Sequence, residues 1–121
     1  MTNAVKKRLL DAKNACQAIL NFTSNTDFAA YESNLMLRSA VERQLEIIGE
    51  ALGKADELKE GLKSDIPALP RIVALRNRVI HGYDSVDHQI VWDIVQTKVP
   101  VLHQQLETLL SGGDLDKKCD F

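Results

Sequence analysis

The sequence predicts a single all-α domain, on the strength of its composition, its length and its apolar spacing. Leu, Ala, Glu, Lys, Arg and Gln dominate, and only six of the 121 residues are aromatic, which is typical of packed helices. The length suits one domain. Apolar residues recur every three or four positions along most of the chain. We therefore expect one helical domain over residues 1–110 and a flexible, mostly charged tail over residues 111–121.

The first helix is predicted from Thr2 or Asn3 to Phe22. Its apolar face is formed by small and aliphatic side chains: Val5, Leu9, Ala12, Cys16, Ile19 and Leu20. Residues 23–27 are rich in turn-forming types and end this helix. Any of Ser24, Thr26 and Asp27 can cap the next one.

The second and longest helix is predicted from Phe28 or Ser33 to Leu58. Its apolar side chains again step by three and four: Leu37, Val41, Leu45, Ile48, Leu52 and Ala55. Glu46 and Glu50 lie on its polar side. Two interpretations stay open for them: a solvated surface, or one carboxylate that pairs with an arginine further along the chain.

Gly61, Pro67 and Pro70 predict a loop of about ten residues before the next helix. A short third helix then fits residues 71–80 and stops near Gly82. A fourth helix is predicted from its cap, Asp87, to residue 110. Pro100 should bend it without ending its apolar pattern.

Charge and apolar content exclude several classes of protein. The net charge of −2 and the isoelectric point of about 5.9 are not those of a general nucleic-acid binder, and no DNA partner is expected. No apolar run approaches the ~18 residues of a membrane span, and charges interrupt the N-terminus at Lys6, Lys7 and Arg8. A cytoplasmic protein with no membrane partner is the expectation.

The two cysteines suggest neither a disulfide framework nor a metal site. Cys16 falls on the apolar face of the first helix and Cys119 in the charged tail, far apart in the sequence. We interpret Cys16 as a small hydrophobic residue of the core. No metal ligand set is proposed.

Positive charge is concentrated in one part of the chain. The stretch from Lys59 to Gly82 contains five lysines and arginines and only two acidic residues. Its net charge is +3, whereas the net charge of the whole chain is −2. Residues 71–86 also hold His81 and Tyr83. A phosphate-bearing ligand would prefer this stretch.

Helix geometry constrains how these residues can act. Asn77 and His81 are four apart and share a face, whereas Arg76 and His81 are five apart and point about 140° from one another. One regular helix does not aim both at one phosphorus atom. Either the helix unwinds near Gly82, or a second copy of the chain supplies part of the site, which favours a symmetric dimer.

The segment Arg76-Asn77-x-x-x-His81 resembles the Arg-x(4 to 6)-His signature of the HEPN superfamily of helical domains. With Tyr83 it becomes Arg-x4-His-x-Tyr, which is similar to the HepT branch of that superfamily. The resemblance extends to residues 40–51 and 86–95, in order and with the expected spacing. It covers roughly residues 3 to 110.

This resemblance implies a HEPN-type up-and-down bundle of four main helices plus short helical turns, working as a homodimer with its site in the dimer cleft. It also implies the toxin of a type VII-like HepT/MntA toxin–antitoxin system: an endoribonuclease that cleaves RNA without a metal or other cofactor. Its partner would be an MntA-like minimal nucleotidyltransferase that silences it by transferring AMP from ATP to Tyr83.

The residue types suit metal-free RNA cleavage. Attack of a 2′-OH on the adjacent phosphorus needs a group that transfers a proton, and the imidazole of His81 is suited to this at neutral pH. It also needs a positive charge next to the negatively charged phosphorane, and Arg76 supplies that charge. Asn77 and Arg78 are interpreted as substrate-positioning residues. Two alternatives stay open: a HEPN subunit that binds nucleotide or RNA without cleaving it, and a purely structural helical dimer.

Overall fold

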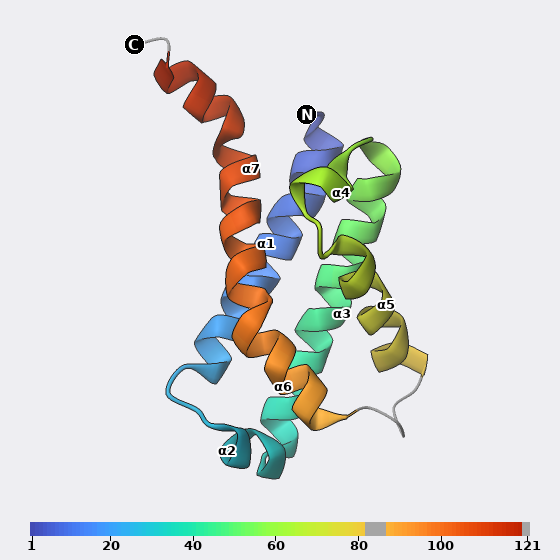
Figure 1. Cartoon of the computed structure of the whole chain (residues 1–121), viewed down its shortest axis with the longest axis vertical. Helices are drawn as coiled ribbons and strands as arrows, with labels where there is room; N and C mark the ends of the chain where they lie inside the picture. Colours follow the sequence, from blue (N-terminus) through green and yellow to red (C-terminus); the bar gives the residue numbers. More distant parts are fainter. Residues whose placement is uncertain (82–86, 120–121) are drawn as a thin grey trace.

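The computed structural model describes the backbone of residues 1–81 and 87–119, and the side chains of residues 1–77 and 87–112. In this part of the chain every regular element is a helix: α1 (Asn3–Thr23), α2 (Phe28–Ser33), α3 (Leu35–Leu58), α4 (Leu62–Asp65), α5 (Leu69–His81), α6 (His88–Thr97) and α7 (Val99–Cys119). The helices assemble into a bundle (Figure 1). The predicted all-α, HEPN-type bundle is confirmed.

Two predicted helix starts are confirmed at their caps. The Thr2 hydroxyl accepts a hydrogen bond from the backbone N–H of Val5 at 3.3 Å, and α1 begins at the next residue. The Asp27 carboxylate accepts from the N–H of Ala30 at 2.9 Å and begins α2. Of the three candidate caps in this turn, Asp27 is therefore the one used.

Of the two predicted starts of the long helix, Phe28 was wrong and Ser33 lies two residues before the observed start of α3 at Leu35, while the predicted end at Leu58 is confirmed. Asn34 has an extended backbone, with φ −113° and ψ 97°, and separates α2 from α3. Its side chain accepts from the N–H of Leu37 at 3.0 Å and caps α3. Asparagine competes with the helix by bonding nearby backbone groups, and apolar periodicity does not record this effect.

The predicted loop before α5 contains a further short helix. Gly61, with a left-handed φ of 81°, turns the chain into α4. Leu62 and Ile66 are fully buried there. α5 then begins at Leu69, two residues before the predicted start, with Pro70 in its first turn, where a missing N–H costs nothing.

The predicted fourth helix is divided into two. α6 begins after Asp87, whose carboxylate accepts from the N–H of Gln89 at 2.9 Å, and it ends before Lys98. α7 follows at once. Pro100 lacks the N–H for the carbonyl four residues earlier, and its ring crowds that turn, so the disturbance that was predicted as a bend at Pro100 falls at Lys98, two residues before it.

The last helix is longer than expected. Its backbone stays helical to Cys119, nine residues beyond the predicted end at Leu110. Figure 1 shows this end of α7 extending past the other helices. The flexibility of residues 111–121 stays a prediction.

α3 is the central helix of the bundle. It packs against α1 and α5, and α1 also packs against α7 (Figure 1). None of the helices in the described part of the chain is long and apolar enough to cross a membrane.

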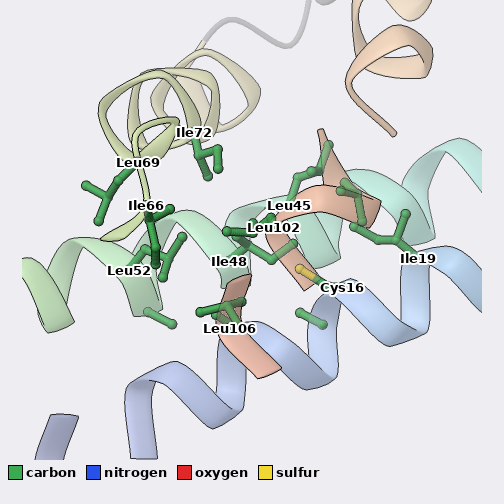
Figure 2. Packing of buried hydrophobic residues seen from close by; sticks show 14 of the residues in the cluster. Cys16, Ile19, Leu45, Ile48, Leu52, Ile66, Leu69, Ile72, Leu102 and Leu106 are labelled. Atoms are coloured by element: carbon green, nitrogen blue, oxygen red, sulfur yellow. The ribbon is translucent and has the colours of Figure 1, made fainter. Parts of the chain in front are cut away.

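The core forms where α1, α3, α5 and α7 face one another. Figure 2 shows side chains from all four helices meeting, with Ile48 and Leu52 of α3 among them. Cys16 is fully buried, and burial raises the pKa of its thiol to about 12. The thiol therefore stays protonated, as expected of a small core residue.

Leu52→Ala tests the central position of α3. Leu52 is fully buried, so its truncation leaves a cavity among helices that only partly relax, and we expect a loss of about 2–5 kcal/mol in the free energy of unfolding. Urea denaturation followed by circular dichroism measures this. Leu58→Ala, an exposed leucine on the same helix, is the control and should cost far less.

Candidate active site

α5 carries the Arg-x4-His segment and is held against α3 by apolar side chains. Leu69 and Ile72 are buried, and Val73 and Leu75 are partly buried against the core. Arg76 follows on the same helix and is half-buried. Packing of α5 on α3 thus places a guanidinium group at the boundary between these two helices.

The guanidinium of Arg76 is oriented by its neighbour in the sequence. Its Nη1 donates a hydrogen bond to Oδ1 of Asn77 at 3.0 Å. Its Nε is buried and has no hydrogen-bond partner within the described residues. Because the amide of Asn77 is neutral, this contact fixes the guanidinium without cancelling its charge.

A cavity of about 380 Å³ lies between α3 and α5. Gly49, Glu50, Lys54 and Glu57 border it from α3, and Arg76 and Asn77 border it from α5. Arg76 and Asn77, the first two residues of the predicted site, therefore border the same cavity.

The other predicted site residues are only partly described. The backbones of Arg78 and His81 belong to α5, and their side chains lie outside the described residues. Tyr83 lies outside them altogether. α5 stays helical through His81, so the backbone between Arg76 and His81 shows no unwinding, and the angle of about 140° between these positions is kept.

Glu46 and Glu50, the two carboxylates left open by the sequence, differ in what they contact. Glu46 forms an ion pair with Arg43 of its own helix at 3.2 Å, the arrangement of a surface carboxylate. Glu50 is exposed and borders the cavity that Arg76 also borders. Arg76 makes no ion pair with a carboxylate in the part of the chain that the structure describes.

The local positive charge is smaller than the sequence count indicated. Lys59 lies 3.6 Å from a carboxylate oxygen of Asp65, and Lys63 lies 3.8 Å from one of Asp56. Asp65 is one of the two acids already counted in the net of +3, whereas Asp56 lies before the counted stretch, so its surface pair with Lys63 partly offsets one further cation. The attraction for a phosphate at the cavity between α3 and α5 therefore depends mainly on Arg76.

Sequence reasoning missed Gly49 and the contact between Arg76 and Asn77. Glycine inside a helix costs roughly 1 kcal/mol relative to alanine, so the two glycines inside α3, Gly49 and Gly53, were the available signal for close packing. Only the fold shows which residue packs against each of them.

A second group of polar side chains lies where α2, α3 and α6 meet. Tyr31 is buried and its ring lies 5.1 Å from that of Trp92. Burial and the nearby Glu42 carboxylate raise the pKa of Tyr31 to about 12. Burial raises the pKa of Glu42 as well, and His88 and Arg38 oppose that rise.

Glu42→Gln is expected to make the folded protein slightly more stable at neutral pH. The folded state raises the pKa of Glu42, so ionisation costs more there than in the unfolded chain, and stability falls as pH rises through this carboxyl's titration. The advantage of glutamine should shrink as the pH is lowered toward 4, where the carboxyl is protonated. Melting temperatures measured from pH 4 to 8 test this, and an advantage independent of pH would contradict it.

The fold and the site together define a small helical domain with an arginine-bearing cavity between two helices. Residues 12–109 match the family described as Ribonuclease HepT-like. The chain belongs to this family, within the HEPN superfamily that its motif resembles.

Three relatives cover nearly the whole chain. "Putative RNase MJ1380" of Methanocaldococcus jannaschii is 34% identical over 85% of this chain and 94% of its own length. "Putative RNase MJ0125" of the same organism is 29% identical, over 94% and 96%. "Probable ribonuclease HepT" of Thermococcus cleftensis is 31% identical, over 90% and 98%. No solved structure matches the chain significantly.

Proposed function

We propose that this protein is an endoribonuclease that cleaves RNA by attack of a 2′-OH on the adjacent phosphorus, without a metal or other cofactor. Membership of a ribonuclease family supports the reaction class. The observation that carries the mechanism is the half-buried guanidinium of Arg76, fixed by a neutral amide at the edge of a cavity.

Arg76 is assigned to the negative charge that develops on the phosphorane. A guanidinium can donate two parallel hydrogen bonds to phosphate oxygens, and Asn77 holds it without neutralising it. His81 is assigned to proton transfer between the attacking 2′-OH and the departing 5′-oxygen. Arg78 is assigned to the flanking RNA backbone.

The active species in this proposal is a homodimer. Because α5 is helical from Arg76 to His81, one copy of the helix places these two positions about 140° apart around its axis. A second copy across a two-fold axis brings an arginine of one protomer near a histidine of the other. Sedimentation velocity should give the mass of two chains, and a fully active monomer would contradict this arrangement.

The cellular role that we propose is that of a toxin controlled by an MntA-like nucleotidyltransferase. The motif tyrosine, Tyr83, lies two residues after His81 in the sequence, so an AMP group attached to it is expected to enter the same cationic site as RNA. Expression of the chain alone in a bacterium should stop growth, and His81→Ala should restore it.

The nuclease proposal is tested with the purified chain, a labelled single-stranded RNA and a DNA of the same sequence, all in EDTA. Cleavage of RNA alone is the expected result. Binding of RNA without any cleavage would instead favour a non-catalytic HEPN subunit, and activity lost on adding the chelator would remove the metal-free mechanism.

A further inference from the structure

α3 and α5 approach one another most closely where Gly49 meets Arg76. Gly49 is buried, and a Cβ placed on it would lie 2.3 Å from the Cβ and 2.7 Å from the Cγ of Arg76. Both distances are shorter than non-bonded carbon atoms can approach one another. The aliphatic stem of Arg76 therefore lies directly over the backbone of Gly49, in the space that a side chain would fill.

This contact leaves little freedom for adjustment. The Cβ of Arg76 is bonded to the backbone of α5, so it moves only if α5 itself moves away from α3. At the other end of the side chain, Nη1 donates a hydrogen bond to Oδ1 of Asn77, and Nε is buried. The Cβ and Cγ of Arg76 are therefore packed against Gly49, and its guanidinium is hydrogen-bonded to Asn77.

The next glycine of α3 makes no comparable contact. A Cβ placed on Gly53, one turn later, would lie 4.0 Å from a methyl group of Val73, which is ordinary van der Waals distance. The requirement for a bare backbone is therefore specific to position 49.

We propose that Gly49 is a positioning residue that sets where the guanidinium of Arg76 stands relative to the reacting phosphate. This inference rests on the proposed ribonuclease function and adds a residue on α3 to a site otherwise formed by α5. A side chain at position 49 would push Arg76 outward together with α5. A displacement of about 1 Å at a catalytic group can lower a rate by about a hundredfold.

The test compares Gly49→Ala with Gly53→Ala, the same change on the same helix. Both are assayed at a temperature at which circular dichroism shows each to be folded. Gly49→Ala should lower kcat by about tenfold to a hundredfold while KM for RNA changes little, because the phosphate contact is lost mainly in the transition state. Gly53 also borders the cavity, but a methyl group there meets only Val73 at van der Waals distance, so Gly53→Ala should keep the wild-type kcat. Equal kcat values for the two variants would overturn the proposal.

A measurement by nitrogen-15 NMR makes the result independent of nuclease activity. The Nε–Hε signal of Arg76 in nitrogen-15 NMR, assigned by its loss in Arg76→Lys, should shift in Gly49→Ala and stay in place in Gly53→Ala. If the wild-type chain does not cleave RNA, the proposed function fails, and this signal still decides whether Gly49 positions the arginine. An unchanged signal in Gly49→Ala would refute it.

A double-mutant cycle covers the case in which Gly49→Ala does not fold. Arg76→Gly removes the Cβ that the new methyl group would strike. In that background Gly49→Ala should fold and melt at the same temperature as Arg76→Gly alone or a higher one, because alanine favours the helix over glycine once the clash is gone. The same loss of stability in both backgrounds would show that the contact with Arg76 is not the reason for the glycine.

Discussion

Arg76→Ala and His81→Ala are each expected to abolish measurable RNA cleavage while the protein stays folded. Loss of a charge-stabilising donor at a reacting phosphate typically lowers kcat by about 10²–10³-fold, and loss of a general acid or base by about 10²–10⁴-fold. Arg76 is half-buried at the edge of a cavity, so its truncation removes little of the core. Initial rates on a labelled RNA in EDTA measure both effects.

The matched control is Arg71→Ala. Arg71 lies on the same helix and has the same charge, but it is exposed and does not border the cavity next to Arg76. It should keep wild-type activity. Full activity of Arg76→Ala or His81→Ala, with helix content unchanged, would remove the assigned mechanism.

Complete silencing of the nuclease by an MntA-like nucleotidyltransferase and ATP is the second large effect expected. The modified peptide should contain Tyr83 and carry the mass of an adenylyl group. The nuclease should be silenced because the attached phosphate would compete with RNA for the arginine site. Mass spectrometry of the treated protein, followed by a cleavage assay, tests both parts together.

The chain contains two tyrosines, which provide the control. Tyr31 is fully buried against Trp92 and is inaccessible to an enzyme. Tyr31→Phe should still be modified and silenced, whereas Tyr83→Phe should remain active. Silencing of Tyr83→Phe by the partner and ATP would show that the partner acts by another route.

The fold class and most helix starts were predictable because they depend on local chemistry. Asp87 acts as the predicted cap, Asp27 is one of the three predicted candidates, and α1 begins at Asn3, one of its two predicted starts, with Thr2 as its cap. The interruption at Asn34 was left open between starts at Phe28 and Ser33, and the one at Lys98 was predicted only as a bend at Pro100, because an uninterrupted apolar pattern looks the same whether the helix continues or restarts.

The site was predictable in its chemistry and not in its packing. Arg76 and Asn77 were assigned from the motif, and the structure places both beside one cavity. Gly49 lies 27 residues earlier in the sequence, and its role appears only when α3 and α5 are packed together. Motif spacing reports neighbours along a helix, whereas contact across two helices depends on how the whole core assembles.

The most direct test of the central claim uses one RNA whose cleavage position has been mapped. A second copy of this RNA carries a single 2′-deoxy nucleotide on the 5′ side of that phosphate, so that the proposed nucleophile is missing. We expect the normal RNA to give a 2′,3′-cyclic phosphate and a 5′-OH, and the deoxy RNA to stay intact at that position. Cleavage of the deoxy RNA at the same phosphate, with a 5′-phosphate on the product, would show that water is the nucleophile and contradict the mechanism.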